Sequence, residues 1–237
     1  MESKKSKGEE NVVVVMTNNI ETKEAANIFT KINSKQQSVS KSLIYDLFRE
    51  LEDDPEHEII RSSDIARYLN TDENSPYFNK IIFPGSSATK GTIQLSVVID
   101  SLKDHVRKNS SFDKKNISSL NVQTKTIANF FDAIKLSYDE IDLWNNSNKN
   151  PFLGAAGFRA GIDVLVNILL DRAQDEKSLK VDFFRKVLSL DSKELLFKDS
   201  KDFKKLGGKE QIKYIIEFLK ESIQSKQEVP SEEDYDI

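Results

Sequence analysis

Apolar residues recur at steps of three and four along most of the chain, which is the spacing of amphipathic helices. Shorter stripes of this kind predict helices around 56–69, 96–106, 158–169, 183–188 and 212–223. The clearest stripe predicts one long helix, and it consists of Ile127, Phe130, Phe131, Ile134, Tyr138 and Ile141. Because Phe130 and Ile134 lie in the middle of that stripe, we expect both in the centre of the core.

The stretch from Phe29 to Leu51 predicts two helices joined by a polar hinge. The hinge begins at Asn33 and ends where the hydroxyl of Ser38 or Ser40 can cap a second helix. The apolar stripe before the hinge is Ile28, Phe29 and Ile32, and the stripe after it is Val39, Leu43, Ile44, Leu47, Phe48 and Leu51.

Strand patterns are few. Val12–Met16 is a continuous, mostly β-branched run that is typical of a buried strand. Two short β-like runs, 81–83 and 92–95, are separated by turn residues and predict a β-hairpin. We therefore predict a mainly α protein with a small β component (α+β), a helical bundle with an N-terminal strand and a short β-hairpin.

Composition supports this fold class. The 237 residues are 38% hydrophobic and 31% charged, with only eight Gly and five Pro, which favours a helical globular protein with a full core. No apolar run approaches the length of a membrane span, so we expect no membrane partner. The chain has no cysteine, which excludes disulfides and thiolate metal sites and is compatible with a cytoplasmic protein.

The ends differ in composition from the rest of the chain. Residues 1–10 are rich in Lys, Glu and Ser, and residues 227–237 form an acidic tail, so we predict that both are disordered. Between them we place one unit at 11–173 and a helical C-terminal extension at 174–226.

Several phrases of the sequence resemble the downstream part of the DGQHR-domain family. This family includes DndB-like factors of DNA sulfur modification and is distantly similar to the ParB-like fold. The Asp-Gly-Gln-His-Arg motif itself is absent here. The matching positions are Phe29, Ile32, Asn33, Gln36, Val39, Ser40 and Leu43, then 75–78 with Ile81, and finally Trp144, Gly154 and Gly157.

The resemblance implies a non-catalytic, DNA-associated regulatory or accessory factor of a bacterial DNA-modification or defence system. One alternative is the catalytic half of a split ParB-like nuclease or nucleotide hydrolase, for which a second protein would supply the missing N-terminal half. Another is a helical protein–protein scaffold. No spacing of acids and histidines fits a metal site, and we expect no cofactor.

Residues for DNA contact are proposed on the resemblance and on charge. The candidates are Asn33, Lys35, Gln36, Lys90, Arg107 and Lys108. Asn33 could equally be a helix cap, and the basic cluster at Arg107 and Lys108, near Phe112, could be a solvated linker instead of a nucleic-acid contact. The net charge of −4 argues for weak binding.

One further segment, 154–158, is rich in small residues and opens a predicted helix. Free amides at such a helix start can bind an anion. Close packing against a neighbouring helix is the more usual role of small residues there, and both interpretations remain open from the sequence.

Overall fold

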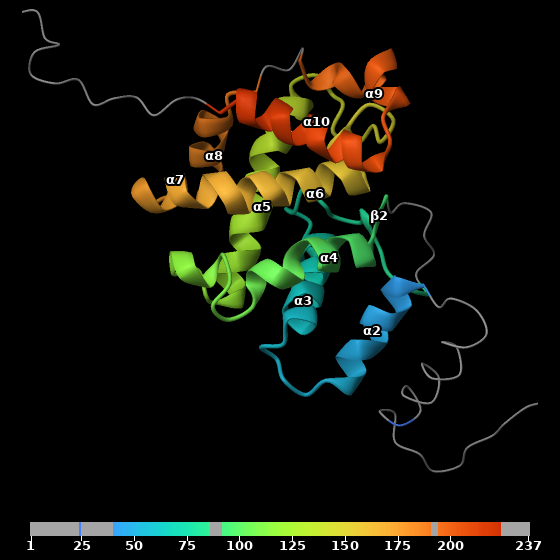
Figure 1. The fold of residues 1–237 in the computed structure, drawn as a ribbon, viewed down its shortest axis with the longest axis vertical. Coiled ribbons are helices and arrows are strands. Elements are labelled where there is room, and N and C mark those ends of the chain that lie inside the picture. Colours follow the sequence, from blue (N-terminus) through green and yellow to red (C-terminus); the bar gives the residue numbers. More distant parts are fainter. Residues whose placement is uncertain (1–23, 25–39, 86–91, 191–193, 224–237) are drawn as a thin grey trace, which may run out of the picture.

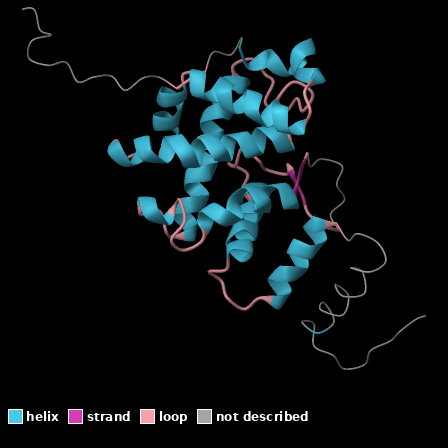
Figure 2. Cartoon of the chain, in the orientation of Figure 1, coloured by secondary structure: helices cyan, strands magenta, loops and turns pink. Residues whose placement is uncertain are grey.

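The protein is described by a computed structural model that covers residue 24 and residues 40–85, 92–190 and 194–223. It is mainly helical with one small sheet, which confirms the predicted fold class (Figures 1 and 2). The predicted strand Val12–Met16 and the predicted disordered ends lie outside the described residues. The helices are α2 (Lys41–Leu51), α3 (Glu58–Thr71), α4 (Leu95–Val106), α5 (Leu120–Asp139), α6 (Ala155–Val164), α7 (Leu170–Asp175), α8 (Val181–Leu188), α9 (Lys201–Lys205) and α10 (Gly208–Glu221).

The sheet consists of β1 (Ile81–Ile82) and β2 (Ile93–Gln94), which pair in parallel, with Ile81 opposite Ile93. The predicted β-hairpin is therefore wrong, since a hairpin joins antiparallel strands. The strands are too short to set their own direction. Because β2 runs directly into α4, the packing of α4 against α3 fixes its direction.

The core is built around α5. Phe130, Phe131 and Ile134 are fully buried there, which confirms the prediction for Phe130 and Ile134. The ring of Phe131 stacks on Phe158 of α6, with ring centroids 5.2 Å apart. The two helices approach closely because the facing residue is Gly161, where a Cβ atom would lie 2.6 Å from the Phe131 ring. The stripe of α5 thus anchors the rest of the bundle.

A continuous helical rod runs through the middle of the molecule. It consists of α6, a π-helical turn (Leu165–Leu169) and α7 (Figure 1). Helix α4 packs on one part of α6, and α10 packs on another. The rod therefore brings together segments that are about a hundred residues apart in sequence.

Helix α2 lies at the edge of this bundle. Its predicted cap is confirmed, since the Ser40 hydroxyl accepts a hydrogen bond from the Leu43 amide at 3.3 Å. Its buried residues are Ser42 and Tyr45. The apolar residues Leu43, Leu47, Phe48 and Leu51 are only partly buried, and Ile44 is 38% exposed. An apolar stripe usually faces the core, but α2 turns its polar face toward α3 and α4.

Candidate functional site

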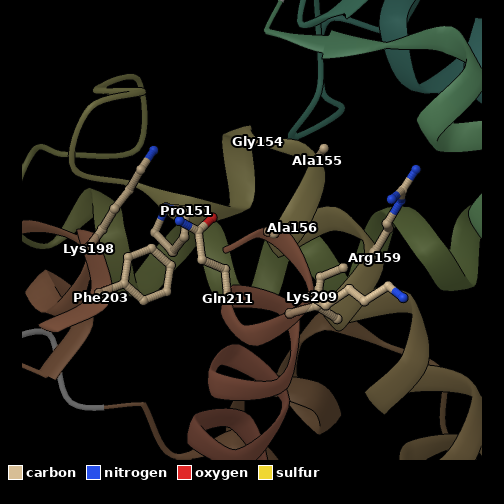
Figure 3. A pocket seen from close by; sticks show the side chains of 11 residues that line it. Pro151, Gly154, Ala155, Ala156, Arg159, Lys198, Phe203, Lys209 and Gln211 are labelled. Carbon is tan, nitrogen blue, oxygen red and sulfur yellow. The ribbon is translucent and has the colours of Figure 1, made fainter. Parts of the chain in front are cut away.

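A pocket of about 490 Å³ lies where the start of α6 meets the start of α10 (Figure 3). We call it the Arg159 pocket. Its wall includes Gly154, Ala155 and Ala156 at the beginning of α6, and Gly208 and Lys209 at the beginning of α10. Its size is in the range of small-ligand sites.

The turn before α6 is rigidly built. Asn150 is fully buried, and its side chain accepts a hydrogen bond from the Phe152 amide at 2.9 Å and donates one to the Trp144 carbonyl at 2.9 Å. Gly157 has no room for a side chain, because a Cβ atom would lie 2.2 Å from the Pro151 carbonyl oxygen. Small residues are therefore used here for close packing, and the same packing fixes the position of the helix start.

Both helix starts leave backbone amides without a side-chain cap. Gly154 and Gly207 occupy the cap positions of α6 and α10, and neither can offer a side-chain acceptor. The first amides of a helix have no intrahelical partner and carry the positive end of the helix dipole. Two such ends at one pocket favour an anion.

Three cationic side chains add to this field. Lys198 lies on one side of the pocket, and Arg159 and Lys209 lie on the other (Figure 3). Neither Arg159 nor Lys209 forms an ion pair with a carboxylate in the described parts of the chain. The pocket wall contains no acidic residue. Glu210 lies outside the wall, in the first turn of α10, and its carboxylate is close to Gly207, where it offsets part of the positive end of that helix.

Lys198 has a structural role as well. Its Nζ donates to the carbonyl oxygen of Ser147 and, at 3.3 Å, to that of Asn150. Burial lowers the pKa of Lys198, and the neighbouring Asp199 opposes this shift. The ammonium group therefore holds the turn before α6, and the rest of the Lys198 side chain forms part of the pocket wall.

A second cavity, of about 250 Å³, lies farther along the same face of α6. It is lined by Asp100, Ser101, His105, Arg159, Ile162 and Asp163, and we call it the Asp163 cavity. Arg159 lines both spaces. The residues of α6 that line them are spaced at three and four along the helix, so the two spaces follow one helical face.

Most polar groups of the Asp163 cavity already have partners. Asp100 accepts hydrogen bonds from Lys41 and Tyr45, both at 2.6 Å. Burial alone would raise the pKa of Asp100, but bonds from Lys41, Tyr45 and Lys103 outweigh burial and lower it. The ring of His105 contacts the Ser111 hydroxyl at 3.1 Å, and burial lowers the pKa of His105 although Asp104 and Asp163 oppose this.

Asp163 differs from these groups. It is partly buried and has no hydrogen bond or ion pair to any residue in the described ranges. Arg159 is its i, i+4 neighbour on α6, a spacing that allows an ion pair, yet the two side chains do not pair. Both charges therefore remain available to a ligand.

The residues predicted from the sequence are not gathered at this pocket. Asn33, Lys35, Gln36 and Lys90 lie outside the described residues. Arg107 and Lys108 are both exposed, at the end of α4.

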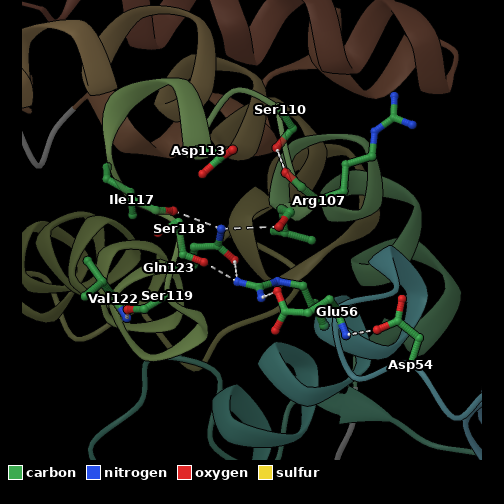
Figure 4. Close-up of polar contacts among 12 residues, drawn as sticks. Asp54, Glu56, Arg107, Ser110, Asp113, Ile117, Ser118, Ser119, Val122 and Gln123 are labelled. Atoms are coloured by element: carbon green, nitrogen blue, oxygen red, sulfur yellow. Dashed lines mark hydrogen bonds and ion pairs between the residues drawn. The ribbon is translucent and has the colours of Figure 1, made fainter.

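The loop that carries Arg107 and Lys108 is held by a polar network (Figure 4). Arg61, only 3% exposed, pairs with Glu56 at 2.5 Å and donates to the buried Gln123 at 3.0 Å. Gln123 in turn donates to the Ile117 carbonyl at 2.9 Å. The side chain of Arg107 extends away from this network.

Phe112, which the sequence places beside the basic cluster, is fully buried. It is a core residue and cannot stack on a base. The Arg107 and Lys108 cluster therefore has exposed charge without an aromatic partner at Phe112.

Sequence reasoning found the small-residue start of α6 but missed Arg159, Lys198 and Lys209. Only the glycines at 154 and 207–208 signalled this site, because a helix that begins with glycine leaves its amides uncapped. Nothing in the sequence pattern brings position 159 next to position 209.

In the described ranges, no group of three or more His, Cys, Asp or Glu residues is placed to hold a metal ion. None of the described helices is both long and apolar enough to cross a membrane.

Comparisons with protein-family models, with curated proteins and with solved structures found no match to this chain. The resemblance to the DGQHR-domain family therefore stays a prediction, and the site must be interpreted from its own chemistry.

Proposed function

We propose that this protein is a non-catalytic, nucleic-acid-associated regulatory or accessory factor that contacts phosphate groups through the Arg159 pocket. The observation that carries the proposal is the charge of the pocket. Arg159, Lys198 and Lys209 line the pocket together with the starts of two helices whose cap residues are glycine, and no carboxylate belongs to the wall. Phosphate oxygens are the acceptors that such a set of donors suits best.

Two features favour nucleic acid as the source of the phosphate. Arg159 and Lys209 are exposed, so a backbone phosphate can reach them from outside the molecule. The phrases shared with the DGQHR-domain family imply a DNA-associated role. The net charge of −4 means that the contact is weak and strongly dependent on salt.

The test compares two charge-matched double variants by fluorescence anisotropy with a short DNA duplex at low salt. Arg159→Ala with Lys209→Ala removes the pocket cations. Arg107→Ala with Lys108→Ala removes the exposed pair predicted from the sequence. Lys198 stays unchanged in both, because it also holds the turn before α6.

We expect the pocket variant to weaken binding about tenfold and to lower the salt slope by about two units, one for each cation removed. The control variant carries the same change in net charge and should bind almost like the wild type. If instead the control variant binds weakly and the pocket variant binds like the wild type, the contact is made by Arg107 and Lys108. Equal losses of affinity in both variants would mean that binding depends only on net charge, and the proposed pocket contact would be wrong.

A helical protein–protein scaffold is the second candidate, and the outward face of α2 is the observation that favours it. Leu43, Ile44 and Leu47 are all partly or largely exposed on that helix. If neither DNA nor inorganic phosphate binds the full chain, the scaffold becomes the better proposal.

A further inference from the structure

We infer that the Arg159 pocket and the Asp163 cavity together form one binding groove for a single nucleotide unit, with its phosphate in the pocket and its sugar and base in the cavity. This inference rests on the proposed phosphate contact and names the rest of the ligand. It follows from the opposite chemical character of two spaces that share Arg159.

The first argument is continuity. Ala155, Arg159 and Asp163 are spaced four residues apart, so they lie in one row along α6. From Ala155 to Asp163 the helix rises about 12 Å. This length suits a phosphate at one end and a nucleobase at the other. Arg159, in the middle of the row, can reach a phosphate from either space.

The second argument is the change of character along the row. The Arg159 pocket offers donors and positive charge, namely Arg159, Lys209 and the free amides of two helices. The Asp163 cavity is lined by the carboxylates of Asp163 and Asp100, and Asp163 is the one left to accept from a ligand because Lys41, Tyr45 and Lys103 already bind Asp100. A nucleotide has the matching polarity, since its phosphate accepts hydrogen bonds while sugar hydroxyls and base amino groups donate them. A simple anion would gain nothing from the carboxylates.

The two carboxylates of the cavity differ in whether other residues already bind them. The carboxylate of Asp100 is held by Lys41, Tyr45 and Lys103 and serves the α2–α4 contact. The Asp163 carboxylate has no such partner among the described residues. Of the two carboxylates in the cavity, it is the one that no described residue engages by a hydrogen bond, and its neighbour His105 acts on it through charge.

The experiment measures binding of inorganic phosphate, ribose 5-phosphate and adenosine 5′-monophosphate to the full chain by calorimetry. We compare the wild type with Asp163→Ala, Arg159→Ala and, as a control of the same type away from both spaces, Asp182→Ala. Asp182 is on α8, outside both spaces. A 5′-phosphorylated and an unphosphorylated single-stranded oligonucleotide distinguish a strand end from a free nucleotide.

The expected signature is that Asp163→Ala weakens binding of one ligand and does not weaken binding of the other. Asp163→Ala should weaken the binding of adenosine 5′-monophosphate by about tenfold, because one hydrogen bond to a charged group is lost. The same variant should leave inorganic phosphate unchanged or slightly tighter, because a negative charge near the anion is removed. Arg159→Ala should weaken the binding of both ligands, and Asp182→Ala should change the binding of neither.

Each failure has its own meaning. If inorganic phosphate does not bind the wild type, the proposed phosphate pocket itself is wrong. If phosphate binds but adenosine 5′-monophosphate binds no tighter, or if Asp163→Ala weakens both ligands equally, the pocket stands and the nucleotide groove is overturned. Variants that lose their melting transition would be replaced by Asp163→Asn, which keeps the shape of the side chain.

Discussion

Helices α5 and α2 are both amphipathic, but the bundle holds them in opposite ways. Helix α5 buries the apolar residues of its stripe, with Phe130, Phe131 and Ile134 at no measurable exposure. Helix α2 leaves its apolar stripe partly exposed and makes its contacts through polar side chains. Its links are Ser42 to the Ser96 amide, Lys41 and Tyr45 to Asp100, Asp46 to Arg67, and Arg49 to Asp64.

This difference teaches how each helix should respond to change. Burial of apolar surface is insensitive to charge and costs much to disturb. Partly exposed ion pairs and hydrogen bonds contribute less and depend on protonation and salt. We therefore expect α2 to separate from the bundle under conditions in which α5 stays packed.

The largest effect is expected from Phe130→Ala. This ring is fully buried and packs edge-to-face on Phe131 and Phe184, with centroids 4.9 and 5.7 Å away. The cavity left behind should lower the free energy of unfolding by about 3–5 kcal/mol. Denaturant melts measure this, and a loss below about 1 kcal/mol would mean that α5 is not the centre of the core.

A smaller effect is expected from Tyr45→Phe. The hydroxyl of Tyr45 donates to Asp100 at 2.6 Å, a bond to a charged group at the α2–α4 contact. Its loss should cost about 1.5 kcal/mol, seen as faster hydrogen exchange of the α2 amides, while α5 keeps its protection. Tyr214→Phe on α10, where the ring is 41% exposed, is the matched control and should change neither helix.

The pH dependence of stability should have opposite signs for Asp100, at the α2–α4 contact, and for Asp132, on α5. The pKa of Asp100 is lowered, so its stabilising effect is present above the ordinary value of about 3.9 and is lost as the pH falls through the lower folded value. Burial raises the pKa of Asp132 on α5, Lys135 opposes this and Asp139 adds to it. Protonation of Asp132 therefore favours the folded state as the pH falls.

Denaturant melts between about pH 3 and 6 can separate these contributions. The Asp100→Asn variant should be less stable than the wild type at the upper end, and this deficit should shrink in acid. The Asp132→Asn variant should be more stable at the upper end, and this gain should also shrink in acid. A deficit for Asp100→Asn that grows in acid would contradict the polar attachment of α2.

The smallest effect is expected from Ile44→Ala on the outward face of α2. Its side chain is 38% exposed, and alanine is the better helix former, so the free energy of unfolding should change by less than about 1 kcal/mol. The same substitution at the fully buried Ile134 of α5 should cost about 2–5 kcal/mol. Equal losses at the two sites would show that the face of α2 is covered in solution.

Much of the helical framework could be predicted from local patterns. The stripe around Phe130 predicted a buried helix because apolar spacing and burial agree there. The cap at Ser40 was predicted because a hydroxyl before an apolar stripe satisfies the nearest free amides. These are interactions between residues a few positions apart, so the sequence shows both partners at once.

The orientation of α2 and the direction of β2 depend on contacts with residues that are distant in sequence. The outward turn of the α2 stripe depends on Asp100 and Arg67, which lie on other helices and offer bonds to its polar face. The strands Ile81–Ile82 and Ile93–Gln94 are too short to determine parallel or antiparallel pairing by themselves, so the packing of α4 determines it.

From the sequence alone we could predict most of the helices, although not α9, as well as the helix that carries the core stripe and the small residues at the start of the helix at 155. Only the tertiary structure placed Arg159 beside Lys209 and Lys198, and Asp163 one turn farther along the same face. The physical reason is that the interactions differ in how far they reach along the chain. Helix propensity, capping and periodicity act over a few residues, whereas the field of a pocket is the sum of charges that only the packing of α6 against α10 and α4 brings together.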